Sequence, residues 1–254
     1  MGSNLAGISD LMADQQRIIE VFSEMAPEYE QKVDNELRRF WGISYQHVIG
    51  QMMKLTEICR TDRILDLATG TSALPIELFR DGKRPASVTG LDITYPMLAN
   101  GKEKIHSIHP GAPIHLTCGS ALALPFRDAS YDIILCGFAA HHLNVESLLS
   151  ESYRVLRPGG RITVADVGRS KILSLPGVDR VVASLAFLYF TIVESPKRAQ
   201  IEASSLPHIY TAAEWTSHFT NAGFCNVEAI ALQTGNHWSP EPLILKGQKI
   251  LTGN

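Results

Sequence analysis

Two aspartates stand where an apolar segment gives way to a turn. Asp66 lies in the sequence ILDLATGTSAL (64–74), and Asp92 lies in VTGLDITYPML (88–98). Short apolar runs that end in this way are typical of buried strands followed by helices. Open parallel sheets bind ligands at the carboxyl ends of their strands. Both carboxylates are therefore predicted to lie at one ligand-binding edge of a sheet.

Asp66 favours a cationic adenosyl ligand over a dinucleotide. A dinucleotide loop has the pattern GxGxxG, whereas this turn has a single glycine, Gly70. A carboxylate about 4 Å from a phosphate dianion would also repel it by several kcal/mol at an effective dielectric near 20. S-adenosylmethionine has no phosphate and carries an ammonium and a sulfonium, so the same carboxylate attracts it. An Asp66 that only caps a helix is the alternative.

Asp92 suits the two hydroxyl groups of a ribose. A carboxylate accepts both hydroxyl protons of a cis-diol, and an acid at the end of the second strand has this role in nucleotide-binding folds. The feature indicates adenosine without separating NAD from S-adenosylmethionine. The alternative is again a helix cap.

The elements around these residues alternate between strand and helix. Such alternation predicts a parallel sheet covered by helices on both faces. The last two strands are expected to be antiparallel, so the fold class is α/β, a Rossmann-like doubly wound seven-stranded sheet with an antiparallel C-terminal edge. The predicted strands are 63–67, 87–91, 114–117, 131–136, 161–167, 226–233 and 242–249, the predicted helices include 71–80, 97–106 and 145–155, and a turn is expected at 157–160.

Three segments divide the chain. Residues 1–59 are predicted to be an N-terminal helical cap segment with a break at Pro27, and residues 60–254 the ligand-binding domain. An insertion at about 168–210 has the composition of a helical cap. It holds the apolar run 181–193, which is too short to span a bilayer comfortably. That run is interpreted as a core helix or as the lining of an apolar substrate pocket. In the tail, Trp215, Phe219 and Ala222 mark one helix face before Gly223.

Composition excludes several classes of protein. The 254 residues are 45% hydrophobic and 19% charged with a formal net charge of −3, so no basic nucleic-acid surface is expected. The four cysteines are scattered without a CxxC pair, which predicts neither a zinc site nor a disulfide framework but reduced, mostly buried thiols. The start, MGSNLAGISDLMADQQ, does not resemble a signal peptide, and a cytoplasmic location is expected.

Five stretches of the chain resemble one enzyme family. They are VFSEMAPEYEQK (21–32), ILDLATGTSALPIEL (64–78), VTGLDITYPMLANGKEK (88–104), GSALALPFRDASYDIIL (119–135) and SYRVLRPGGRITVADV (152–167). In order and spacing they resemble class I S-adenosylmethionine-dependent methyltransferases. The nearest branch is the ubiquinone/menaquinone-biosynthesis C-methyltransferase-like group with its natural-product relatives. The segment 209–224 is similar to the same superfamily.

The resemblance implies S-adenosylmethionine as cofactor and a role for each loop. The loop after the first strand would hold the methionine end, Asp92 the ribose, and the loop after the third strand the adenine. The residues implied are Asp66, Ala68, Thr69, Gly70, Thr71, Asp92, Ile93, Met97, Gly119, Ser120, Ala121 and Phe138. 

Three positions depart from the family pattern. Ala68 and Ser72 stand where the family usually has glycine, with Ala expected to cost little and Ser72 to start a helix. Ser120 replaces a common acid, which predicts a weaker grip on the adenine amino group.

The candidate catalytic residues are His141, His142 and Tyr29. The histidines follow the fourth strand and could act as a general base, although a packing role is the alternative. By resemblance Tyr29 would close over the cofactor near its sulfonium, or it packs on a helix. Second-line candidates are His208, Tyr210 and His237, and no metal is expected.

The acceptor is expected to be a small lipophilic or aromatic molecule, such as a secondary metabolite, because residues 173–194 are rich in apolar side chains. Carbon as the methylated atom follows from the resemblance, and oxygen is the alternative. Three rival classes are an S-adenosylmethionine-binding enzyme that steers a cyclisation, a non-catalytic cofactor-binding assembly partner, and an NAD(P)-dependent oxidoreductase. No nucleic-acid partner is expected, and a homo-oligomer is left open.

Overall fold

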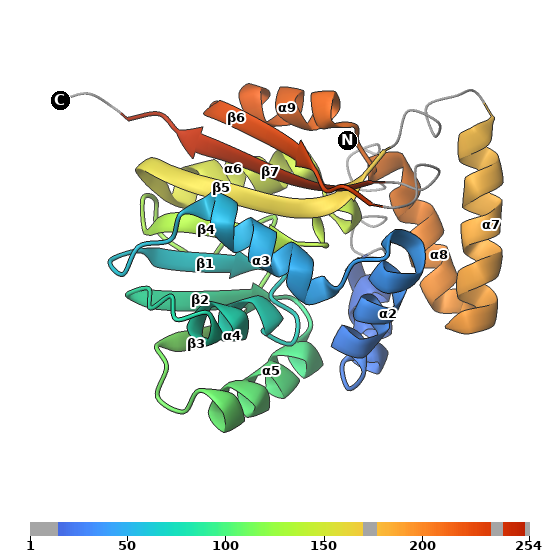
Figure 1. Ribbon diagram of the computed structural model, residues 1–254, viewed down its shortest axis with the longest axis horizontal. Coiled ribbons are helices and arrows are strands. Elements are labelled where there is room, and N and C mark those ends of the chain that lie inside the picture. The colour runs from blue at the N-terminus through green and yellow to red at the C-terminus, as the bar shows by residue number, and fades with distance from the viewer. Residues whose placement is uncertain (1–14, 170–176, 235–240, 252–254) are drawn as a thin grey trace, which may run out of the picture.

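The computed structural model describes residues 15–169, 177–234 and 241–251, and within them seven strands form one sheet in the order β3-β2-β1-β4-β5-β7-β6 (Figure 1). The strands are β1 (Arg63–Leu67), β2 (Ser87–Asp92), β3 (Ile114–Cys118), β4 (Tyr131–Gly137), β5 (Leu156–Gly168), β6 (Phe224–Ala231) and β7 (Glu241–Lys249).

The direction of the strands confirms the predicted fold class. Neighbours among β1 to β5 pair in parallel, whereas β7 runs antiparallel to both β5 and β6. The strand order reverses between β1 and β4, where ligands bind in doubly wound sheets. 

The prediction of a turn at 157–160 is wrong, because these residues belong to strand β5. The pairing with β4 jumps from Tyr131–Leu156 to Ile133–Arg161, so the extra residues form an irregularity inside the strand.

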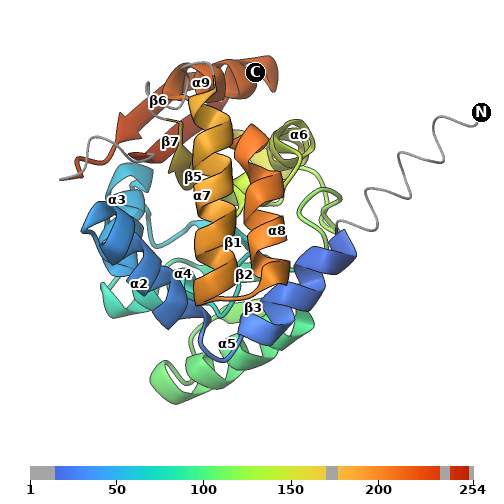
Figure 2. The ribbon, with the colours of Figure 1, turned by 90° about the vertical axis from the view of Figure 1, so that its right-hand side faces the viewer.

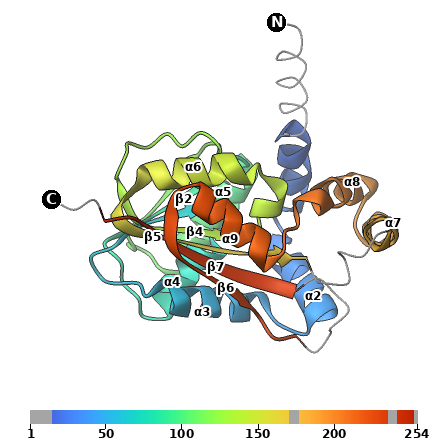
Figure 3. The same ribbon diagram turned by 90° about the horizontal axis from the view of Figure 1, so that it is seen from above.

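Helices cover both faces of the sheet. One face carries α3 (Tyr45–Thr56) and α4 (Ala73–Arg80), and the other carries α6 (Val145–Val155) and α9 (Ala212–Asn221) (Figure 3). α5 (Tyr95–Ile108) packs against α4 and against β2 and β3. Met52 and Leu78 belong to the core cluster under α3 and α4. Trp215 and Phe219 of α9 are fully buried on the opposite face, as their spacing predicted, and Gly223 follows with a φ of 94°.

The N-terminal segment is helical with a break at the predicted place. Residues 15–25 form a helix, residues 26–28 form a turn around Pro27, and α2 (Tyr29–Trp41) follows. Gly42 ends α2 in the left-handed conformation, and the hydroxyl of Ser44 caps α3 by accepting a hydrogen bond from the backbone N–H of His47.

The insertion after β5 contains α7 (Val178–Val193), α8 (Pro196–Ser205) and a 3₁₀ turn, η2 (Leu206–His208). Figure 2 shows α7 and α8 crossing in front of the carboxyl ends of the strands, beside α2. The expectation of a core helix is wrong, since Leu185 and Ile192 of α7 are 61% and 74% exposed. Composition marked this helix as apolar but could not place it at the rim of the molecule. Among the described residues, no helix combines the length and apolarity that a bilayer span requires.

The cysteines are free, but the expectation that most are buried is wrong. Cys59, in the connection between α3 and β1, and Cys118, at the end of the edge strand β3, are both exposed. Cys136 is buried in the central strand β4.

Candidate functional site

The loop between β1 and α4 has left-handed backbone at three alternate positions. Ala68, Gly70 and Ser72 have φ values of 51°, 53° and 65°. Glycine adopts this conformation freely, whereas other residues are disfavoured by about 1–2 kcal/mol. The expectation that alanine costs little at position 68 is therefore wrong. Ser72 stands at the N-cap of α4, but its side chain makes no capping hydrogen bond, contrary to expectation.

Replacing Ser72 with glycine is expected to stabilise the fold. The Ser72 hydroxyl is fully buried without a hydrogen-bond partner, and it lies against α5, where a Cβ on Gly101 would approach its Oγ to 2.4 Å. Ser72→Gly should raise the free energy of unfolding by about 1–2 kcal/mol, because it removes the left-handed strain and the unpaired hydroxyl. Ser72→Ala removes only the hydroxyl and should give a smaller gain. Chemical denaturation measures both, and a loss of stability in the glycine variant would contradict the strained loop.

Asp66 lies at the end of β1 but behind the loop. Its side chain is buried and accepts a hydrogen bond from Oγ1 of Thr69 at 2.5 Å. Burial, with the nearby Asp92 carboxylate, raises the pKa of Asp66 to about 7, although the Thr69 hydrogen bond opposes the shift. Thr71 is turned to the N-terminal segment, where its hydroxyl donates to Glu30. Asp66, Thr69 and Thr71 thus shape and anchor the loop without lining its cavity.

Asp92 joins the two loops at the end of β2. Its Oδ2 accepts from the backbone N–H of Gly70 and its Oδ1 from that of Thr94, both at 2.8 Å. Burial raises the pKa of Asp92, and the backbone hydrogen bonds oppose that shift. Each carboxylate oxygen has a second lone pair, so Asp92 can also accept hydroxyl protons from a ligand in the cavity that it lines.

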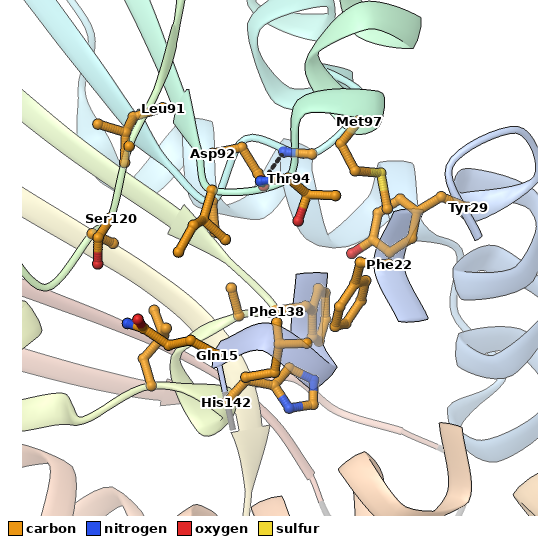
Figure 4. Close-up of a pocket in the computed structure, with 18 residues that line it drawn as sticks. Gln15, Phe22, Tyr29, Leu91, Asp92, Thr94, Met97, Ser120, Phe138 and His142 are labelled. Carbon is orange, nitrogen blue, oxygen red and sulfur yellow. Dashed lines mark hydrogen bonds between the residues drawn. The ribbon is translucent and has the colours of Figure 1, made fainter. Parts of the chain in front are cut away.

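A first cavity, of about 90 Å³, opens beside these loops. Figure 4 shows Asp92 and Ser120 at one side of it, with Tyr29, Phe22 and His142 opposite. The Ser120 hydroxyl accepts from the backbone N–H of Leu122. The site residues proposed from the sequence that line this cavity are Tyr29, Ala68, Gly70, Asp92, Ile93, Met97, Gly119, Ser120, Ala121, Phe138 and His142.

The N-terminal helix supplies walls that the sequence did not reveal. Gln15, Ile18 and Phe22 line the first cavity from residues 15–25. Tyr29 lies over the loop, since a Cβ on Gly70 would be 3.6 Å from its ring. Neither periodicity nor motif spacing indicates that a helix preceding the first strand reaches this edge of the sheet.

A second cavity, of about 210 Å³, extends from the first toward α7 and α8. Its walls are largely aromatic and aliphatic, and the inner face of α7 contributes Val182, Ala186 and Phe190. This supports the interpretation of the apolar run as the lining of a pocket. Four residues line both cavities: Phe22, Tyr29, Phe138 and His142.

His141, which lines the second cavity, forms a buried pair with Asp166 of β5 behind it. Nδ1 of His141 lies 2.5 Å from Oδ1 of Asp166, whose carboxylate also accepts from the backbone N–H groups of His141 and Val167. Because a carboxylate is an acceptor, Nδ1 carries the proton and Nε2 is left to accept one. Burial lowers the pKa of His141, but the Asp166 charge and hydrogen bond outweigh it and raise the pKa above its ordinary value.

His142 has the opposite electrostatic character. Burial, followed by the positive charges of His141 and Arg198, holds the pKa of His142 well below its ordinary value. Its ring packs edge-on against Phe22 at the junction of the cavities. Neighbouring groups whose pKa values are pushed apart are typical of acid–base sites. Asp166 was not singled out from the sequence, where it lies within an unremarkable strand pattern.

Within the described part of the chain, His141, His142 and Glu202 have potential metal-ligand atoms within 4.8 Å of one another. Nη2 of Arg198 lies 2.7 Å from Oε1 of Glu202, however, and this cation competes with a metal ion for the carboxylate. The arrangement therefore suits proton transfer better than metal binding.

The second-line candidates lie elsewhere. His208 is exposed, and Tyr210 packs against Trp215 and His218 of α9 rather than lining either cavity. His237 is outside the described residues.

Known structures share this architecture. Geranyl diphosphate C-methyltransferase from Streptomyces coelicolor A3(2), solved with Mg²⁺, geranyl diphosphate and S-adenosyl-L-homocysteine, matches with a TM-score of 0.64 over 88% of this chain and 84% of that chain. The [4+2]-cyclase SpnF matches with a TM-score of 0.61 over 84% and 86%. Both are 15% identical in sequence, so they establish the fold alone.

Sequence comparison identifies the family. Residues 65–164 match the family described as a methyltransferase domain. The chain is 29% identical over 150 residues to demethylmenaquinone methyltransferase of Lactiplantibacillus plantarum, covering 59% of this chain and 62% of that relative. It is 32% identical over 177 residues to ubiquinone/menaquinone biosynthesis C-methyltransferase of Methylobacterium nodulans, covering 68% of this chain and 67% of the relative. The chain therefore belongs to the class I S-adenosylmethionine-dependent methyltransferases, in the branch of the ubiquinone/menaquinone-biosynthesis C-methyltransferases.

Proposed function

We propose that this protein transfers a methyl group from S-adenosylmethionine to a small apolar or aromatic acceptor that carries an ionisable hydroxyl group. The observation that carries the proposal is the junction of two cavities, one lined by Asp92 and one lined by His141, whose ring is held from behind by Asp166. The first would hold the cofactor and the second the acceptor. Their shared walls would bring the reacting atoms together and exclude water.

The residues around the first cavity fit S-adenosylmethionine. Asp92 offers lone pairs for ribose hydroxyls, and Leu91, Ile93 and Met97 offer apolar surface for a flat base. The left-handed loop brings backbone close to the ligand, with Tyr29 above it. When bound, the cofactor supplies an electrophilic methyl group on a sulfonium.

His141 is the proposed general base. Its Nε2 would accept the hydroxyl proton of the acceptor, while Nδ1–H continues to donate to Asp166, which holds the ring and stabilises the imidazolium. Loss of that proton raises the electron density of a phenol on its oxygen and on its ring carbons. The names of the relatives favour carbon as the methylated atom, and NMR of the product would distinguish carbon from oxygen.

A calorimetric titration with S-adenosylmethionine, and with NAD as control, tests the first step of the proposal. Binding of S-adenosylmethionine alone is expected, because the loop has a single glycine in place of the GxGxxG pattern that cradles a pyrophosphate. Incubation with lipophilic phenols should then release S-adenosylhomocysteine. Binding of NAD alone would contradict the proposal, and acceptor conversion without S-adenosylhomocysteine would indicate a non-methylating reaction such as cyclisation.

Cofactor affinity should depend on pH through Asp66. Asp66 does not line the cavity, but its charge would attract the cofactor's ammonium across the loop, and its pKa of about 7 in the free protein means that acidification neutralises that charge. The Kd should rise by up to about tenfold per pH unit between pH 7 and 5.5, a range in which an α-amino group stays protonated. Asp66→Asn should flatten this dependence and weaken binding at pH 7.5. Calorimetry across the range measures both proteins, and a pH-independent wild-type Kd would remove Asp66 from cofactor recognition.

A further inference from the structure

A buried ionic cluster occupies one end of the second cavity. Arg198 of α8 is 5% exposed, and its Nη2 lies 2.7 Å from Oε1 of Glu202 and 3.9 Å from Oε2 of Glu36. The guanidinium is also held over the rings of Phe22 and Phe190, with 5.1 and 5.8 Å between Cζ and the ring centroids. Contacts with Phe22 of the N-terminal helix, Glu36 of α2 and Phe190 and Glu202 of the cap thus fix the orientation of Arg198 before any ligand binds.

Three buried polar atoms of this cluster lack a hydrogen bond: Nε of Arg198, a donor, and Oε1 of Glu36 and Oε1 of Glu202, which are acceptors. Oε1 of Glu202 already lies against Nη2 of Arg198, which leaves Nε of Arg198 and Oε1 of Glu36 for a ligand. Both residues line the second cavity together with His141 and His142. A buried polar atom without a partner costs about 1–3 kcal/mol, so a ligand that pairs both atoms gains affinity. A hydroxyl or a carboxamide can donate to one and accept from the other.

The charges of the cluster nearly balance. Glu202 and Glu36 face the positive charge of Arg198, and the nearby pairs Lys32–Glu194 and His141–Asp166 each balance within themselves. Burial raises the pKa of Glu36 to about 7 despite the opposing effect of Arg198, so Glu36 carries only part of a negative charge near neutrality. An anionic ligand group would meet two carboxyl groups, and a cationic one would meet the guanidinium, whereas a neutral group meets neither penalty.

We propose that Glu36 and Arg198 form a specificity subsite for a neutral hydrogen-bonding group, a hydroxyl or carboxamide, on a part of the acceptor remote from the methylated atom. This inference rests on the proposed function, because it takes the second cavity as the acceptor site. The aromatic walls hold the apolar body of the acceptor, and the subsite selects the polar group at its end.

Four ligands with one ring system test the subsite. They are 2-(naphthalen-2-yl)ethanol, 2-ethylnaphthalene, 2-naphthylacetate and 2-(naphthalen-2-yl)ethylammonium, titrated into protein saturated with S-adenosylhomocysteine and followed by isothermal titration calorimetry. The alcohol should bind about tenfold more tightly than 2-ethylnaphthalene, because its hydroxyl group adds hydrogen bonds that the ethyl compound cannot make. The carboxylate and the ammonium should both bind more weakly than the alcohol.

Variants assign that preference to Glu36. Glu36→Met keeps the length of the side chain and should reduce the advantage of the alcohol to within about twofold, with little change for 2-ethylnaphthalene. Glu36→Gln should retain most of it. Glu28→Met makes the same charge change on a side chain that is 70% exposed, and it should leave the ratio at its wild-type value. A purely structural role for Glu36 would change the Kd values of all four ligands together.

Several outcomes would overturn the subsite. They are equal or undetectable binding of the alcohol and the ethyl compound by the wild type, tighter binding of either charged ligand, or an unchanged ratio in Glu36→Met. If S-adenosylhomocysteine binds and any of these is observed, only the subsite is refuted. If S-adenosylhomocysteine itself does not bind, the proposed function is refuted and the subsite with it.

Discussion

His141→Ala should lower kcat by about 10²–10⁴-fold while leaving the Kd of S-adenosylmethionine within about twofold of wild type. The reason is the separation of the two cavities: His141 lines the second and not the first. Its Nε2 is the proposed proton acceptor, and alanine leaves no group to replace it. Single-turnover kinetics with a phenolic acceptor, together with calorimetric titration of the cofactor, measures the two quantities separately.

The pH profile gives a sharper test of the same histidine. His141 accepts a proton only when neutral, and Asp166 raises its pKa above the ordinary value, so the rate should rise with pH through that raised pKa. Asp166→Asn removes the negative charge that raises the pKa of His141. The rise of the rate with pH should therefore occur at lower pH in this variant, and its maximum rate should be lower. His115→Ala, at an exposed position on the edge strand β3, is the matched control and should behave as wild type. An undiminished rate in His141→Ala would exclude it as the base.

Asp92→Ala should raise the Kd of S-adenosylmethionine by about 5–150-fold, which corresponds to about 1–3 kcal/mol for lost hydrogen bonds to a charged group. The effect has two sources. The carboxylate is the proposed ribose ligand, and it also holds the backbone N–H groups of Gly70 and Thr94 in place. The substitution removes the direct contact and loosens the loop that carries the methionine end of the site.

Conservative and exposed variants separate these sources. Asp92→Asn keeps one carbonyl oxygen as an acceptor and should lose less affinity than the alanine variant. Asp81→Ala, at an exposed helix end, should change neither affinity nor stability appreciably. Calorimetry measures the affinity for the cofactor, and thermal unfolding measures the stability of each variant. Both are needed, because the N–H groups of Gly70 and Thr94 lose their acceptor in Asp92→Ala, which lowers stability as well as affinity. Wild-type affinity in Asp92→Ala would place the ribose elsewhere.

The sequence alone determined the sheet and its ligand-binding edge. Apolar runs and helical periodicity located β1 to β4 within a residue or two, because β1, β2 and β4 are largely buried on both faces and are therefore mostly apolar, whereas the edge strand β3 is only partly buried. The same logic placed Asp66 and Asp92 at strand ends. The sequence pattern did not indicate the left-handed backbone of Ala68 and Ser72. The hydrophobic pattern predicts which residues are buried, but it does not predict the backbone conformation of a loop.

Only the tertiary structure decided what closes the site. Asp166 looks like any acid in a strand until β5 brings it beside His141, 25 positions away. Arg198 and Glu36 are 162 positions apart in the chain and meet across the cavity because α8 packs near α2. The composition of α7 likewise does not predict that one face of this helix is exposed to solvent. Periodicity reports how each segment relates to its own neighbours along the chain, whereas the acceptor cavity is made by contacts between segments that share no local pattern.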